Sequence, residues 1–141
     1  SFFVKFLLGI MALTFFLLFV LIISYKEMRP LAVQGDVKAQ YFLSIMYKMG
    51  DVVTQDYKQS VYWTTKAAEQ GHVKAQYNLG HMYVDGDGTP QDYVMAHMLF
   101  NIAAANGNED AKTNRDRVED MMTSNQIEQA QQLAKEWIEK Y

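Results

Sequence analysis

The chain has 141 residues, enough for one modest domain beside a strongly apolar N-terminal stretch. It carries 13 Lys and Arg against 16 Asp and Glu, and residues 30–141 alone hold 10 basic and 15 acidic side chains. An acidic domain without a basic stripe argues against binding to nucleic acid and against adhesion to anionic lipid. The absence of cysteine excludes a disulfide, a thiolate nucleophile and a cysteine-based zinc site.

The N-terminal part contains eighteen consecutive residues, 6–23, without a charge, interrupted only by Gly9 and Thr14. As a helix this run would extend about 27 Å, close to the ~30 Å hydrocarbon core of a bilayer. We therefore predict a single transmembrane anchor helix over residues 1–28. Its membrane-anchoring side chains are Phe6, Leu7, Leu8, Ile10, Phe15, Phe16, Leu17, Leu18, Phe19, Leu21, Ile22 and Ile23.

A cleaved secretion signal is the alternative interpretation of this segment, with Lys5 as the remnant of its basic front. The apolar region of a signal runs about 7–15 residues and ends at a small-residue cleavage site. Here the run is longer, and residues 22–26 contain no A-x-A pattern, so a retained anchor is favoured. Because the chain starts at Ser1 rather than Met, we expect that some N-terminal residues are missing or have been processed.

The side of the membrane on which the remainder lies is open to two interpretations. Lys26 and Arg29 come after the span and only Lys5 precedes it, which by the positive-inside tendency places the C-terminal part in the cytoplasm. A short N-terminal tail directly before the span is instead the usual layout of a signal anchor, which exports the C-terminal part of a chain. We favour export, with the polar region on the periplasmic side of a bacterial inner membrane.

Beyond the span the chain repeats itself at an offset of 36 residues. Residues 35–47 and 71–83 are identical at nine of thirteen positions, and Asp56-Tyr57 recurs as Asp92-Tyr93. Fixed periodicity of this length indicates a solenoid. The predicted repeat region covers residues 29–123, and its units are 35–70, 71–106 and a partial third copy at 107–122.

Each period predicts two helices. In the first, Ala39, Leu43, Met46 and Tyr47 share one face, and residues 57–68 give a second helix that Asp56 and Gln59 are placed to cap. The glycines that come after each second helix suit a left-handed terminal residue. These are Gly35, Gly71 and Gly107.

The recurring residues resemble the Sel1-like repeat, a relative of the tetratricopeptide repeat. The resemblance covers about residues 31–137 and lies in Asp56-Tyr57, Tyr62-Trp63, Lys66-Ala67-Ala68-Glu69-Gln70-Gly71 and the run 75–83, with a tail, 114–131, similar to the family's closing segment. Two positions depart from the pattern: Val52 stands in place of Gly88, so the first loop is expected to differ in shape, and Leu99 stands where the family often has Trp. The resemblance implies an all-α, right-handed superhelix of antiparallel helix pairs that serves as an adaptor for other proteins.

Terminal units of a solenoid need covers. At the C-terminal end we predict a capping helix in residues 124–141, started by Thr123 and Gln126 as a capping box. Its expected buried stripe is Ile127, Ala130, Leu133, Ala134, Trp137 and Ile138. At the other end we expect the helix leaving the membrane to take the place of a preceding second helix, with a kink or break at Arg29-Pro30 and no disordered linker.

The first helices of such solenoids tend to line the concave side, where amphipathic aromatics can anchor a partner. The repeat-matched positions least tied to the packing face are therefore the predicted partner-binding residues. They are Tyr41, Ile45, Lys48, Tyr77, His81 and Val84.

No catalytic, cofactor or metal site is predicted. His72, His81 and His97 lack the spacing of a metal site. The loop 85–89 resembles a calcium loop, but Pro90 and Ala96 occupy the positions where an EF-hand needs glycine and a bidentate acid.

Three functions remain as hypotheses. The leading one is a non-catalytic, membrane-tethered interaction protein, an accessory or assembly subunit of a complex such as a respiratory or secretory assembly, with other protein subunits and the bilayer as partners and no nucleic acid or small-molecule substrate. The second is a secreted or periplasmic regulator released by signal cleavage. The third, a small hydrolase or other enzyme, would need a closed pocket that gathers His81 or His97 with two carboxylates.

Overall fold

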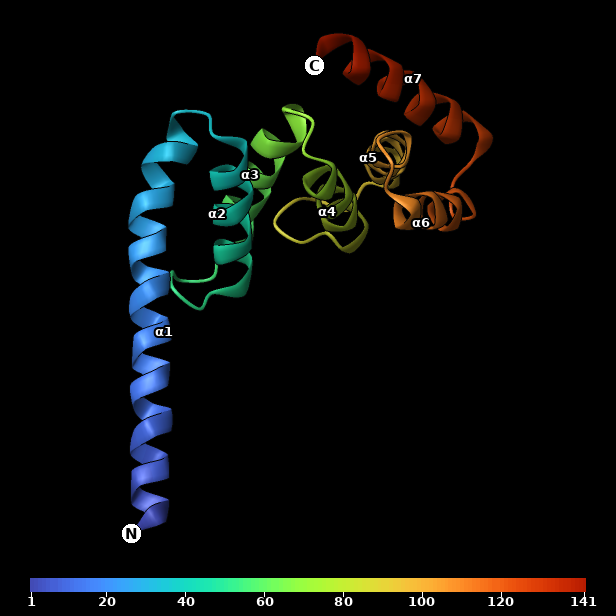
Figure 1. The fold of residues 1–141 in the computed structure, drawn as a ribbon. Helices are drawn as coiled ribbons and strands as arrows, with labels where there is room; N and C mark the ends of the chain where they lie inside the picture. The colour runs from blue at the N-terminus through green and yellow to red at the C-terminus, as the bar shows by residue number, and fades with distance from the viewer.

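The computed structural model describes residues 1–141 as seven α-helices without a strand (Figure 1). The all-α prediction is therefore confirmed. The helices are α1 (Phe2–Val33), α2 (Val37–Met49), α3 (Tyr57–Glu69), α4 (Val73–Asp85), α5 (Tyr93–Ala105), α6 (Glu109–Glu119) and α7 (Ser124–Lys140). Each of the helices α1 to α5 packs against the next helix along the chain, and α7 lies on α5. The N-terminal part of α1 extends well beyond the rest of the molecule (Figure 1).

Local signals at the helix ends act as the sequence predicts. The Asp56 carboxylate accepts a hydrogen bond from the backbone N–H of Gln59 at 3.0 Å and caps α3. Thr123 and Gln126 form the full capping box of α7. Gly71, just beyond the end of α3, has a φ of +83°, a conformation that costs little only for glycine.

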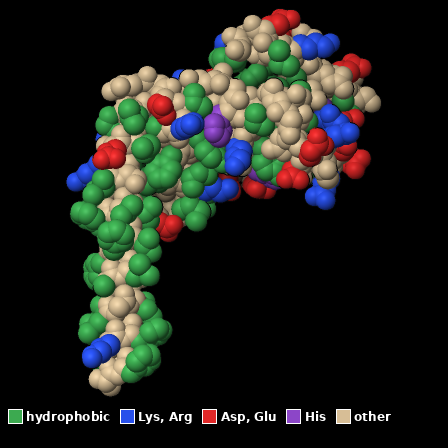
Figure 2. Space-filling view, viewed as in Figure 1, with side chains coloured by type: hydrophobic (Ala, Val, Ile, Leu, Met, Phe, Trp, Pro, Cys, Tyr) green, Lys and Arg blue, Asp and Glu red, His purple; other side chains and the backbone are tan.

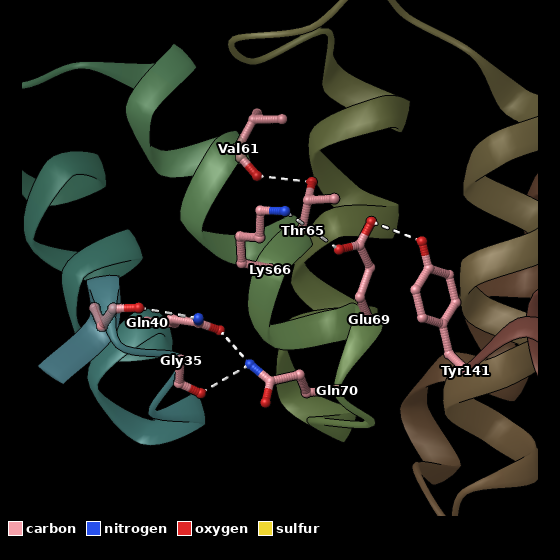
Figure 3. Close-up of polar contacts among 9 residues, drawn as sticks. Gly35, Gln40, Val61, Thr65, Lys66, Glu69, Gln70 and Tyr141 are labelled. Atoms are coloured by element: carbon pink, nitrogen blue, oxygen red, sulfur yellow. Dashed lines mark hydrogen bonds and ion pairs between the residues drawn. The ribbon is translucent and has the colours of Figure 1, made fainter.

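Amide side chains make the same contacts in successive units, and Figure 3 shows those of Gln40 and Gln70 in the first unit. The Gln76 amide donates to the Ala68 carbonyl at 3.2 Å, and the Gln40 amide donates to the Ala32 carbonyl at 3.1 Å. Gln40 also accepts from Gln70 at 2.8 Å. Ala32 thus stands in α1 where Ala68 stands in α3, so the end of α1 takes the place of a preceding second helix, as expected from the offset of 36.

The link between α1 and α2 is an unbroken helix. The sequence predicts a kink or break at Arg29-Pro30, and the break is wrong, because α1 continues through Pro30 to Val33 and the Gln34 N–H donates to the Pro30 carbonyl at 3.1 Å. A proline inside a helix removes one backbone hydrogen bond. The contacts of Met28 and Ala32 with α2 and α3 offset that loss, so the helix is not broken and no disordered linker separates it from the repeats.

Close helix approach in the second unit depends on a glycine. A Cβ atom on Gly80 of α4 would lie 2.6 Å from the ring of Phe100 on α5, and that ring is fully buried. The matching positions of the first unit hold Ser44 and Thr64, both buried. The first unit therefore has two side chains of similar, small size at these positions, whereas the second unit pairs a glycine with a large aromatic ring.

Helix α7 covers the end of the solenoid with less of its surface than predicted. Ala130 and Ala134 are buried, and the Tyr141 hydroxyl donates to Glu69 of α3 at 3.0 Å (Figure 3). Ile138, expected in the buried stripe, is 61% exposed. That prediction was wrong because α7 packs mainly against one helix, α5, which covers fewer of its side chains than two neighbouring helices would.

Candidate functional site

The exposed N-terminal two-thirds of α1, residues 2–23, is the most apolar surface of the molecule. Every residue from 2 to 23 is exposed, and Figure 2 shows hydrophobic side chains along this stalk. Such a patch far exceeds the few hundred Å² that soluble monomers expose. By length and composition α1 can cross a membrane, and a signal sequence near an N-terminus has the same properties.

The two predicted tyrosines lie between neighbouring first helices. Tyr41 of α2 accepts a hydrogen bond from Asn78 of α4 at 3.1 Å and stacks on His72. Tyr77 of α4 makes the same contact with Asn114 of α6, at 2.9 Å. Each tyrosine therefore joins one first helix to the next and keeps only part of its ring on the surface.

The other four predicted residues extend the same strip along α2 and α4. His81 is half-buried, with its Nε2 3.1 Å from the Asn114 amide nitrogen and its ring edge-on to Phe100. Ile45 and Val84 are half-buried, and Lys48 is exposed. The six residues thus form one partly exposed strip of aromatic, aliphatic and basic character, which we call the first-helix strip.

The pKa values of two histidines, His81 of the first-helix strip and His72 beside it, are lowered from the ordinary value. Burial and the nearby Lys74 lower the pKa of His72, whose Nδ1 accepts a hydrogen bond from the Ala75 N–H at 3.2 Å and caps α4. Burial, opposed by Asp85, also lowers the pKa of His81. A protonated Nδ1 cannot accept a hydrogen bond, so protonation of His72 would remove the cap.

The solenoid is therefore expected to lose stability as pH falls below about 6.5. The pKa of each histidine is lower in the folded state than in the unfolded state, so the unfolded chain is protonated at a higher pH. The free energy of unfolding therefore decreases as pH falls from the unfolded pKa to the folded pKa. In His72→Asn, the residue type that caps α6, the urea midpoint should fall less over this range. Equal pH slopes in the two proteins would contradict this role of His72.

A polar groove of about 420 Å³ lies where α5, α6 and α7 meet, and the sequence did not predict it. His97 of α5 is 1% exposed, its Nε2 lies 3.1 Å from a Glu119 carboxylate oxygen, and its Nδ1 has no partner. Arg115 and Lys135 lie on the rim. No local signal marks this groove, because it depends on how α7 crosses α5 and α6.

The histidines do not form the constellation that a hydrolase would need. His97 meets a single carboxylate, and His81 meets an amide. The groove brings no serine or threonine beside His97. Nothing in this arrangement gives a positive sign of catalysis.

Comparison with known proteins places the repeats. Residues 37–72 and 73–108 each match the Sel1 repeat. The fold resembles that of c5321, a protective antigen of uropathogenic Escherichia coli strains displaying an SLR fold, with a TM-score of 0.80 and 37% identity over 83% of this chain and 25% of that one. A Sel1 repeat protein from Oxalobacter formigenes matches with a TM-score of 0.65 and 33% identity, over 67% of this chain and 39% of that one. The chain thus spans less than half the length of either protein, and no curated protein matches it.

Proposed function

The chain belongs to the Sel1 repeat family, and we propose that it is a non-catalytic protein-interaction module held on a membrane by α1. Sel1 repeats form protein-interaction modules, so binding to other proteins is the general function of this family. The proposed organisation is an anchor at residues 1–28, the repeats at 29–123 and a capping helix at 124–141.

One observation carries the membrane part of this proposal. The exposed, apolar part of α1 ends at Ile23, and the contacts of α1 with the solenoid begin directly after it, at Tyr25 and Met28. Burial in a bilayer would remove the exposed apolar part from water at about 25 cal/mol per Å². The same helix would therefore serve as a span over its first two-thirds and as a repeat helix over its last third.

The proposed partners are other protein subunits of a membrane complex. The first-helix strip supports this, because its tyrosines, histidine and lysine combine apolar area with polar tips, as residues at binding surfaces often do. A complex of a bacterial inner membrane, respiratory or secretory, with the repeats on the periplasmic side, suits a small module held close to the bilayer.

Carbonate extraction and then affinity purification from gently solubilised membranes of the source organism test both parts. The protein should stay in the membrane pellet and copurify with specific subunits. Lys48→Glu/Val84→Glu should weaken that association by about tenfold, equivalent to about 1.4 kcal/mol. Lys66→Glu on the exposed side of α3 is the matched control and should bind normally.

Two results would contradict the proposal. A mature N-terminus near Tyr25 would show a cleaved signal and favour a released regulator. Recovery of the protein alone, as a monodisperse monomer, would count against a role as a subunit.

A further inference from the structure

The loop that joins α2 to α3 is more apolar than its counterpart between α4 and α5. At three matched positions, one at the last residue of the preceding helix and two in the loop, a polar or glycine residue of the second unit is replaced by an apolar one in the first. Met49 replaces Asp85, Val52 replaces Gly88 and Val53 replaces Thr89. The first helices of the two units are closely alike, whereas α3 and α5 share only three of thirteen residues, so the surroundings of each loop decide how these replacements are explained.

The structure explains two of these three replacements. A Cβ on Gly88 would lie 2.2 Å from the Tyr57 carbonyl oxygen of α3, so glycine is required where the second loop meets α3. The first loop meets α1 instead (Figure 1), and Val52 and Val53 pack against the same core cluster as Tyr25 and Met28 of α1. These valines therefore belong to the core that α1 shares with the first unit.

Met49 has no such explanation. It is the last residue of α2, it is 60% exposed, and it packs in none of the core clusters. Tyr25, which packs in the cluster that holds Val52 and Val53, lies only two residues, or about 3 Å of helix, beyond the end of the exposed apolar run at Ile23. The Tyr25 hydroxyl also lies 3.3 Å from that of Tyr47, two residues before Met49 in α2, so Met49 lies near the bilayer surface if α1 spans the bilayer up to Ile23.

The polar groups at this level suit the same environment. The hydroxyls of Tyr25 and Tyr47 are 3.3 Å apart, and tyrosine is enriched where a protein crosses the membrane–water boundary. Lys26 and Arg29 line a groove of about 410 Å³ on α1. Together with Lys48 they give three positive charges in this part of the chain against the two negative charges of Glu27 and Asp51. A net charge of only +1 favours apolar contact over attraction to anionic lipid.

We propose that residues 48–53, the α2–α3 edge, rest on the bilayer, with the Met49 side chain among the phospholipid headgroups. This inference rests on the proposed anchoring by α1. The solenoid would then be fixed at two points, by the rigid end of α1 and by the α2–α3 edge, and would not swing about the anchor. Its partner would have to reach the first-helix strip close to the membrane surface.

Single-cysteine labelling tests this directly, because the chain has no cysteine of its own. Met49→Cys carries an environment-sensitive fluorophore, Asp85→Cys is the repeat-matched control, and Leu17→Cys reports on the span. The full chain is reconstituted in phosphatidylcholine vesicles that contain a nitroxide lipid labelled either at the headgroup or in the middle of the acyl chain. Parallel samples include phosphatidylglycerol or added salt.

The label at position 49 should be quenched several-fold more than the label at 85 by the headgroup nitroxide, with little effect of salt or lipid charge. The label at 17 should be quenched by the mid-chain nitroxide. Equal quenching at 49 and 85, with 17 quenched, would overturn the α2–α3 edge proposal and leave the anchor standing. An unquenched label at 17 would overturn both, and quenching at 49 only with phosphatidylglycerol would overturn apolar insertion.

Discussion

Gly80→Ser is expected to destabilise the solenoid by about 1–3 kcal/mol, the usual cost of overpacking a core. Glycine to serine in a helix is favourable by intrinsic propensity, so any loss must come from the tertiary structure. The new Cβ would lie 2.6 Å from the buried Phe100 ring, which also contacts Tyr77 and His81 and cannot move without disturbing them. Urea unfolding of the full chain in nonionic micelles, monitored by helical circular dichroism, measures the change.

The first unit supplies the control for this prediction, because it pairs Ser44 with Thr64 at the matching positions. Phe100→Thr alone should lower the free energy of unfolding by about 3–5 kcal/mol, as expected when a buried aromatic is truncated. An osmolyte is therefore added to all samples to keep this variant folded. In that background Gly80→Ser should cost almost nothing, because the space it needs is empty. A coupling energy near zero in this double-mutant cycle would show that Gly80 and Phe100 are not matched to each other.

The period of 36 residues predicted more of this structure than helix propensity alone would allow. It placed Ala32 in register with Ala68, and the amides of Gln40 and Gln76 make the same contact with these two residues. It also contains a signal for the contacts between units: Asn78 and Asn114 lie 37 residues beyond Tyr41 and Tyr77, and the structure joins both pairs. A repeat therefore predicts its own interfaces, because each unit contacts the next in the same way.

The predictions that failed concern parts of the chain without a repeat counterpart. The break at Pro30 came from a local rule, and packing of the last turn of α1 on α2 overrode it. Ile138 was placed in the buried stripe from periodicity, which gives the face of a helix but not the width of the surface that covers it. The groove at His97 depends on the crossing of α7, which no spacing in the sequence encodes.

Ala32→Arg is expected to detach the last turns of α1 from the repeats. Ala32 is 1% exposed and packs in a core cluster with residues of α2 and α3. An arginine there would be a buried charge without a partner, which destabilises the fold by about 3–5 kcal/mol. In a solenoid each unit is stabilised by its neighbours, so the loss should stay near the point of change. Amides of α2 and α3 should exchange roughly 100- to 4,000-fold faster, at 1.4 kcal/mol per tenfold, while those of α5 and α6 keep their protection.

Val33→Arg is the matched control, because Val33 lies next to Ala32 but is 70% exposed, so the same charge there stays in water. Hydrogen exchange of the full chain in micelles, resolved by segment, separates the two variants. Equal exchange in both would mean that the end of α1 is not a structural cover, and faster exchange in every helix would mean that the solenoid unfolds as one unit. Selective exposure of α2 and α3 would show that the apolar helix does more than hold the protein in place: its last third completes the first repeat, so the anchor and the solenoid fold as one structure.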